Sequence, residues 1–165
     1  MEKKMLSFCG MDKCSVDANG RIKLGPRFLE DFAMRGGEIV LHCLPEGAIA
    51  VYPEDIYLEM RRNETNPAEH AAGSFVYRRT LRRFGTMSQS ERISAQGRIT
   101  LPQMFRDHAD IRNGKEVIVA GVEIGIEIWN VERWKEEQAR IHEHMIRKSE
   151  QEMEQDLVVT GERQK

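Results

Sequence analysis

Two short stretches of this chain hold the side chains best suited to chemistry. In the first, Asp17 precedes Gly20-Arg21, and in the second, Ser94 precedes Gly97-Arg98. A guanidinium is a planar cation whose forked N–H donors match phosphate oxygens and the acceptor edge of guanine. A carboxylate four residues earlier can accept N–H groups of the intervening turn or brace the guanidinium. The spacing therefore predicts anion-binding arginines held by a turn.

The residues around each arginine predict how it is positioned. Asn19-Gly20 and Gln96-Gly97 are turn signals, and the stretches 21–24 and 98–101 then alternate polar and apolar residues. Each stretch is therefore predicted to form a hairpin, with Ile22 facing the core and Arg21 and Lys23 on the solvent-exposed face. The alternative is an ordinary turn with a surface salt bridge of small energetic value. Recurrence of the Gly-Arg pair favours a functional interpretation.

The same spacing of 77 residues relates longer segments of the chain. Carried forward without a gap, it matches Phe28 with Phe105, Gly37 with Gly114, and Ile49 with Ile126. A duplicated unit is predicted, with the order strand, strand, short helix, strand, strand. One unit is too small to bury a sufficient core alone, so the two copies are expected to share one core about an approximate two-fold axis.

The predicted fold class is α+β, with two β-rich repeats, a middle helix and a long C-terminal helix. The expected ranges are 11–56 for repeat 1, 57–87 for a helical connector, 88–131 for repeat 2, 132–155 for the C-terminal helix and 156–165 for a disordered tail. A short helix is expected to open at Pro53, and a second helix is expected from Pro67 to about Phe84, with a packed side that includes Ala68, Ala72, Phe75, Val76 and Leu81. Its basic end, with Arg78, Arg79, Arg82 and Arg83, is a solvated helix end or a phosphate or subunit contact.

No pattern in the sequence points to an enzyme. There is no nucleophile elbow, no phosphate-binding loop and no metal-ligand spacing. Cys9, Cys14 and Cys43 are odd in number and sparse, which suits a reducing compartment better than a disulfide framework. No apolar run is long enough to span a membrane, and no secretion signal is recognised. We expect no cofactor, no metal, no small-molecule substrate and no membrane partner.

Several motifs resemble the MraZ family of bacterial regulators, which are built from two SpoVT-AbrB-type units. They are Phe8-x-Gly10, Val16-Asp17-x-x-Gly20-Arg21, Arg98-Ile99-Thr100-Leu101-Pro102 and Ile126-Glu127-Ile128-Trp129, within a resemblance over roughly residues 8–145. The resemblance implies a DNA-binding transcriptional regulator that forms rings of subunits in the cytoplasm, on the nucleoid. It also implies action at the promoter of the division and cell-wall gene cluster, including its own gene. Two departures are Ser94 in place of the second Asp, and Gly25-Pro26, which shifts a proline by one place.

Charge is distributed unevenly enough to permit DNA binding despite a net charge of −2. Local field, rather than net charge, decides where phosphate binds. The residues expected to contact DNA are the two turn arginines and the polar residues near them: Asp17, Arg21, Lys23, Lys13, Arg27, Arg92, Arg98 and Thr100. The alternative function is a non-enzymatic oligomeric scaffold that binds a protein partner through its exposed hairpins.

Overall fold

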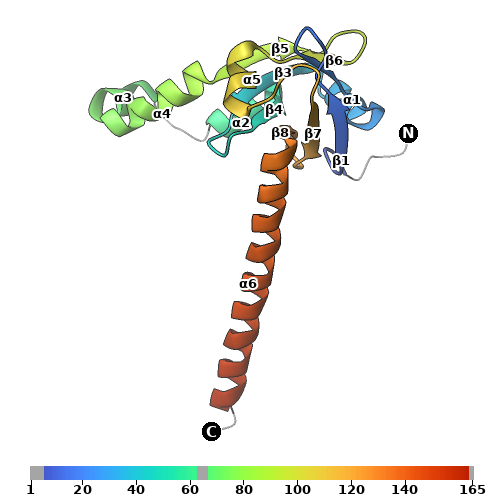
Figure 1. Cartoon of the computed structure of the whole chain (residues 1–165). Coiled ribbons are helices and arrows are strands. Elements are labelled where there is room, and N and C mark those ends of the chain that lie inside the picture. Colours follow the sequence, from blue (N-terminus) through green and yellow to red (C-terminus); the bar gives the residue numbers. More distant parts are fainter. Residues whose placement is uncertain (1–5, 63–66, 164–165) are drawn as a thin grey trace. The chain divides into compact units, whose positions relative to one another are not determined.

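The computed structural model describes residues 6–62 and 67–163, which divide into one unit ending at Val131 and a second beginning at Glu132. The first unit is an α+β fold built on an antiparallel sheet (Figure 1). Its first half contains β1 (Met11–Ser15), β2 (Arg21–Lys23), α1 (Pro26–Ala33), β3 (Glu38–Cys43) and β4 (Ile49–Pro53). Its second half contains β5 (Ser88–Arg92), β6 (Arg98–Thr100), α5 (Gln103–Ala109), β7 (Glu116–Gly121) and β8 (Ile126–Asn130). The predicted order of elements is confirmed in both halves.

The predicted hairpins across the two turns are wrong. β1 pairs with β7, and β2 pairs with β6, so the strands on either side of each turn find partners in the other half of the chain. A Gly-containing turn specifies a local change of direction, but it does not specify which strand completes the hydrogen-bond ladder. The six-stranded sheet has the order β1-β7-β8-β4-β3-β5, and β2 and β6 form a separate two-stranded ribbon.

One hydrophobic core holds the first unit together, and both halves contribute to it. Helices α1 and α5 each insert a fully buried phenylalanine, Phe28 and Phe105. α1 begins at Pro26, where the missing N–H costs nothing, and its Phe32 lies one turn after Phe28 on the buried face. Strands β3 and β4 are buried almost throughout, since neighbouring strands and helices cover them. Burial of this kind supplies most of the stabilising free energy of a domain.

The gapless repeat spacing fails by one residue in the third strand of each half. β3 begins at Glu38 and β7 begins at Glu116, so these strands are 78 residues apart, whereas β4 and β8 return to a spacing of 77. The extra residue follows α5, where Asp110 takes a left-handed conformation with φ 52°. The core face of β7 therefore carries Val117 where that of β3 carries Ile39, not Val40 as the gapless spacing predicted.

The described part of the connector contains α2 (Glu54–Arg62), α3 (Pro67–Gly73) and α4 (Phe75–Thr86). The short helix expected from Pro53 is present as α2, whereas the helix expected from Pro67 to about Phe84 is divided into α3 and α4. Residues 63–66 of the predicted connector lie outside the described residues. α3 and α4 are separated at Ser74, whose Oγ accepts the Tyr77 N–H at 3.2 Å and so caps α4. Gly73 disfavours continuation of the helix at the same point. The predicted packed side is also wrong, because Ala68, Ala72, Phe75 and Val76 are exposed.

The second unit, which begins at Glu132, is formed by the C-terminal helix α6 (Val131–Arg163), whose first residue belongs to the first unit. It continues past residue 155, where a tail was expected to begin, and residues 164–165 lie outside the described residues. The segment 150–157 contains Glu, Gln, Met and Leu, which are good helix formers, and no Gly or Pro. These residues favour continuation of the helix beyond the predicted boundary at residue 155.

Candidate nucleic-acid interface

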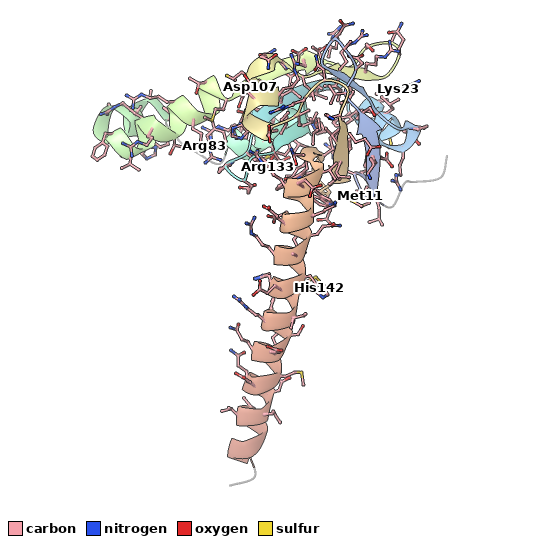
Figure 2. The ribbon with its side chains drawn as sticks, viewed as in Figure 1. Met11, Lys23, Arg83, Asp107, Arg133 and His142 are labelled. Carbon is pink, nitrogen blue, oxygen red and sulfur yellow. The ribbon has the colours of Figure 1, made fainter. Side chains whose placement is uncertain are left out.

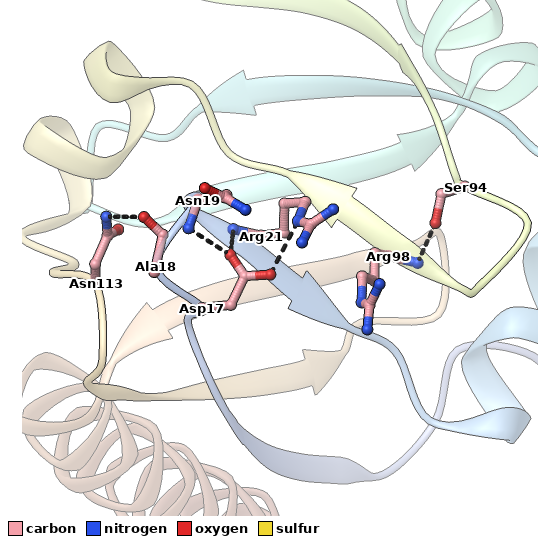
Figure 3. A network of polar contacts seen from close by, with 7 residues as sticks. All are labelled: Asp17, Ala18, Asn19, Arg21, Ser94, Arg98 and Asn113. Atoms are coloured by element: carbon pink, nitrogen blue, oxygen red, sulfur yellow. Dashed lines mark hydrogen bonds and ion pairs between the residues drawn. The ribbon is translucent and has the colours of Figure 1, made fainter.

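The β2–β6 ribbon brings the two arginine stretches together. Its antiparallel register places Arg21 opposite Thr100 and Lys23 opposite Arg98, with Ile22 opposite Ile99 between them. Both isoleucines are fully buried, so they point into the core. Side chains alternate along a strand, and the four polar residues therefore share the opposite face. Lys23 and Thr100 are exposed, and Arg21 and Arg98 are half-buried. Lys23 is labelled in Figure 2, and the side chains of Arg21 and Arg98 are drawn in Figure 3.

The Asp17 carboxylate organises the first turn and braces its arginine. Oδ1 accepts the backbone N–H groups of Asn19 at 2.8 Å and Arg21 at 2.9 Å, and Oδ2 accepts the Arg21 Nε–H at 2.9 Å (Figure 3). The Arg21 backbone N–H, with further help from Asn19 and the guanidinium, lowers the pKa of Asp17 against the opposing effect of burial. Asp17 thus stays ionised at neutral pH, and the predicted double role of its carboxylate is confirmed.

Ser94 performs only half of this role in the second turn. Its Oγ accepts the Arg98 backbone N–H at 3.0 Å (Figure 3). Within the described ranges, the Arg98 guanidinium has no hydrogen-bond or ion-pair partner. The orientation of the Arg98 guanidinium is therefore not fixed by a side-chain contact within the described ranges, whereas a charged hydrogen bond to Asp17 holds that of Arg21.

The remaining residues predicted to contact DNA lie outside the ribbon, on different elements. Lys13 of β1 and Lys23 of β2 line one groove of about 570 Å³, which also contains Asp12. Arg27 of α1 lies 3.8 Å from the Asp12 carboxylate and over the Phe28 ring. Lys13 itself pairs with Glu116 at 3.7 Å. These side chains are exposed and lie on elements next to the ribbon in the chain or in space.

Arg92 differs from the others because the edge strand β5 carries it. Its guanidinium donates to Glu38 of the neighbouring strand β3 at 2.7 Å. This cross-strand ion pair is exposed, so it is worth little energetically and is easily exchanged for another anion. The structure nevertheless gives Arg92 a local partner that the sequence did not predict.

Comparisons with known proteins place the chain in a family. The family model described as "MraZ protein, putative antitoxin-like" matches residues 89–157. The transcriptional regulator MraZ of Clostridium acetobutylicum is 31% identical over 131 residues, which cover 78% of this chain and 85% of that protein. The transcriptional regulator MraZ of Bifidobacterium longum is 31% identical over 120 residues, covering 73% and 75%. The chain belongs to the MraZ family. The name of these relatives describes regulators of transcription and not a class of enzyme.

Two residues of this MraZ-family chain support the first turn although no local sequence pattern indicated it. Asn113 Nδ2 donates to the Ala18 carbonyl at 3.0 Å, and Arg106 Nη1 donates to Asn113 Oδ1 at 2.7 Å. The turn that they support lies far away in sequence, so neighbouring residues could not reveal the contact.

The basic end of α4 is partly occupied by structural contacts in this MraZ-family chain. Arg78 donates to the Ala71 carbonyl at 2.7 Å, and the Arg83 guanidinium lies 5.2 Å from the Phe84 ring centroid. Arg79 and Arg82 are exposed. Arg78 and Arg83 therefore help to fix helices α3 and α4 and the aromatic residues near these helices. These contacts favour a structural role for the two arginines over a phosphate contact.

The described part of the chain shows neither a metal site nor a membrane span. Among residues 6–62 and 67–163, no group of three or more His, Cys, Asp or Glu side chains is arranged to hold a metal ion. In the same ranges, no helix combines the length and the apolar character needed to cross a bilayer.

Proposed function

We propose that this chain is a sequence-specific DNA-binding transcriptional regulator that reads DNA with the β2–β6 ribbon. The observation that carries the proposal is the shared outer face of Arg21, Lys23, Arg98 and Thr100. The major groove admits a two-stranded ribbon, and arginine to guanine is the commonest specific contact within it. The names of the relatives, which describe transcriptional regulators, support the same function.

The residues of the interface divide into three roles. Arg21 and Arg98 provide the main contacts to base edges or phosphates, and Lys23 and Thr100 extend them along the ribbon. Lys13, Arg27 and Arg92 flank the ribbon and exchange their weak surface ion pairs for phosphate oxygens. Asp17 does not bind DNA through its charge, which repels phosphate, but orients Arg21.

We infer that the first unit is a duplicated SpoVT-AbrB-type fold with an approximate two-fold axis through the ribbon. Ile22 pairs with Ile99, its counterpart 77 residues later, which supports an axis between them. The strand order supports it too, because exchanging β1, β3 and β4 with β5, β7 and β8 reverses the order of the sheet. Leu24 N–H donates to Gly97 O at 2.9 Å, and Leu101 N–H donates to Gly20 O at the same distance. Two equivalent arginines would then approach DNA from related directions.

The target and the assembly follow from the family resemblance. The target is the promoter of the division and cell-wall gene cluster, including the protein's own gene, and the working form is a ring-shaped homo-oligomer on the nucleoid in the cytoplasm. Exposed apolar side chains on α4, such as Phe75 and Val76, support contacts between subunits. Several ribbons in one assembly would combine weak contacts into tight binding to repeated DNA sites.

Footprinting of the DNA upstream of the protein's own gene, followed by binding titrations at several salt concentrations, tests the proposal. Wild-type protein should protect a defined segment and bind it more tightly than a scrambled sequence, with affinity falling steeply as salt rises. Arg21→Ala and Arg98→Ala should weaken binding and reduce the salt slope by about one for each phosphate that a bound chain no longer touches.

Arg133→Ala provides the control, because Arg133 belongs to α6 and not to the ribbon. Equal losses of affinity for all three variants would indicate a response to bulk charge and would refute the ribbon as the reading surface. Absence of a footprint, together with salt-insensitive capture of a protein partner, would favour the scaffold function instead.

A further inference from the structure

The first turn rests on side chains from the second half of the chain. Arg106 of α5 donates from Nε to the Leu101 carbonyl at 2.9 Å and from Nη1 to Asn113 Oδ1 at 2.7 Å. Asn113 in turn contacts the first turn, because its Nδ2 donates to the Ala18 carbonyl at 3.0 Å (Figure 3). A chain of polar contacts therefore links the end of β6 to the backbone of the Asp17–Arg21 turn.

Close packing accompanies these hydrogen bonds. Gly20 is buried and has φ +74°, and a Cβ at this position would lie 2.8 Å from Cζ of Arg106. The absence of a side chain at Gly20 thus lets the guanidinium lie directly against the turn. Arg106 supports the turn from outside, while Asp17 fixes it from within.

Within residues 6–62 and 67–163, the second turn has no equivalent support. The residue 77 positions before Arg106 is Leu29. Between α5 and β7 the spacing is 78 residues, so the counterpart of Asn113 is Arg35, which pairs with Asp55 at 2.6 Å. A Cβ at Gly97 would lie 2.7 Å from Cδ1 of Leu29, so the second turn packs on an aliphatic side chain. Among the described residues, no side chain donates to the Ala95 carbonyl, the counterpart of Ala18.

We propose that Arg106 and Asn113 are positioning residues that hold the Asp17–Arg21 turn in its reading geometry. Both act through the turn rather than through contact with DNA, and they make the two halves of the ribbon unequal. Sequence discrimination depends on the orientation of side chains that reach base edges, whereas phosphate contacts carry affinity without sequence information. Loosening the first turn should therefore lower discrimination more than general affinity. This inference rests on the proposed DNA-binding function.

Asn113→Ala in the full-length chain is the most direct test, since it breaks the contact without changing charge. Binding should be measured by fluorescence anisotropy with a DNA fragment from upstream of the protein's own gene and with a scrambled fragment, over a series of salt concentrations. We expect the ratio of specific to non-specific affinity to fall about threefold to tenfold, with an unchanged salt slope. Tenfold corresponds to about 1.4 kcal/mol.

Two arginine variants separate positioning from direct contact with phosphate. Arg106→Leu introduces the residue found at the counterpart position, and it should lower the ratio as Asn113→Ala does. Arg112→Leu is the matched control, because Arg112 is exposed in the loop that follows α5 and its removal changes the charge equally. If Arg106→Leu and Arg112→Leu both flatten the salt slope and leave the ratio unchanged, Arg106 contacts phosphate and the positioning role is refuted.

Amide hydrogen exchange provides a test that does not depend on DNA. In wild-type protein, the Gly20 and Arg21 amides should exchange more slowly than those of Gly97 and Arg98, which serve as the internal reference. Asn113→Ala should accelerate exchange in the first turn about tenfold and leave the second turn unchanged. If both turns exchange equally in wild type, or if Asn113→Ala alters neither, the inference is wrong. Wild-type protein could instead bind the specific and scrambled DNA equally while the hydrogen-exchange result is as expected. That outcome would refute the proposed DNA-binding function but would leave intact the inference that Arg106 and Asn113 support the first turn.

Discussion

At the scale of single residues, the two halves of the ribbon differ mainly in how firmly an arginine is held. Asp17 accepts three N–H groups, including the Arg21 Nε–H, whereas Ser94 accepts one. A carboxylate offers more acceptor sites than a hydroxyl, and its hydrogen bonds to charged donors are stronger. The same carboxylate repels phosphate, so firm orientation and general attraction to DNA oppose each other at this position.

The first residue-scale prediction exchanges these two side chains. Ser94→Asp should brace Arg98 and raise the ratio of specific to non-specific DNA affinity, even though the added negative charge lowers overall affinity modestly. Asp17→Ser should lower the same ratio. Both variants should be titrated against operator and scrambled DNA at one salt concentration. A lower ratio for Ser94→Asp, or an unchanged ratio for Asp17→Ser, would contradict this division of roles.

The second residue-scale prediction concerns acid. The pKa of Asp17 is lowered chiefly by the Arg21 backbone N–H, so its stabilising contribution is complete above the ordinary carboxyl pKa of 3.8. It is lost only as pH falls through the lower value of the folded protein. The Arg21 Nε–H signal in an NMR titration should therefore stay constant from neutral pH to about pH 5 and move in stronger acid. Asp17→Asn should abolish the later change, and a midpoint at or above 3.8 would contradict the assignment.

Sequence reasoning succeeds at this scale where the interacting residues are neighbours. The contacts of Asp17 and Ser94 lie within four residues, so turn chemistry predicts them. Asn113 and Ala18 are 95 positions apart. Their contact depends on how the two halves pack, and a single sequence holds no local signal for it.

At the scale of elements, the pairing of β2 with β6 converts two separate turns into one surface. The alternation of Arg21-Ile22-Lys23 predicts the strand and its buried face, and both are confirmed. The partner strand could not be predicted, because the same alternation suits a hairpin within one half or a ladder between halves. Pairing between halves allows the two equivalent isoleucines to meet in one core.

The element-scale prediction tests this pairing. Ile22 and Ile99 are both fully buried and directly opposite, so Ile22→Ala should lower the free energy of unfolding by about 2–5 kcal/mol. Combination with Ile99→Ala should give a loss that departs from the sum of the single losses by about 0.5 kcal/mol or more. Urea denaturation measures each value. Lys23→Ala, an exposed neighbour, is the control and should change stability by no more than about 0.5 kcal/mol.

At the scale of the whole molecule, much apolar surface is left uncovered in each unit. Phe75 and Val76 of α4 are 65% and 60% exposed, and Met145 and Leu157 of α6 are 61% and 71% exposed. Single exposed apolar residues are common, whereas a contiguous exposed apolar patch is a frequent sign of a protein contact. The sequence predicted Phe75 and Val76 on a packed side, but neither is covered within the described chain, which supports a contact with another subunit.

The whole-molecule prediction is a homo-oligomer whose contacts include α4. Light scattering should give a mass several times the 19.1 kDa of one chain at micromolar concentration. Phe75→Glu should shift the population toward smaller species, because a charge buried in an apolar contact is costly. Gln89→Glu adds the same charge at an exposed position of β5 and should leave the mass unchanged.

The assembly also predicts how DNA affinity depends on the number of sites. Linked ribbons convert the second binding event into an intramolecular one, so a fragment with two operator repeats should bind wild-type protein about tenfold or more tightly than a fragment with one. Phe75→Glu should reduce this advantage while leaving binding to the single repeat nearly unchanged, since its own ribbon is intact. A monomeric wild-type protein, or equal affinity for one and two repeats, would contradict binding by linked subunits.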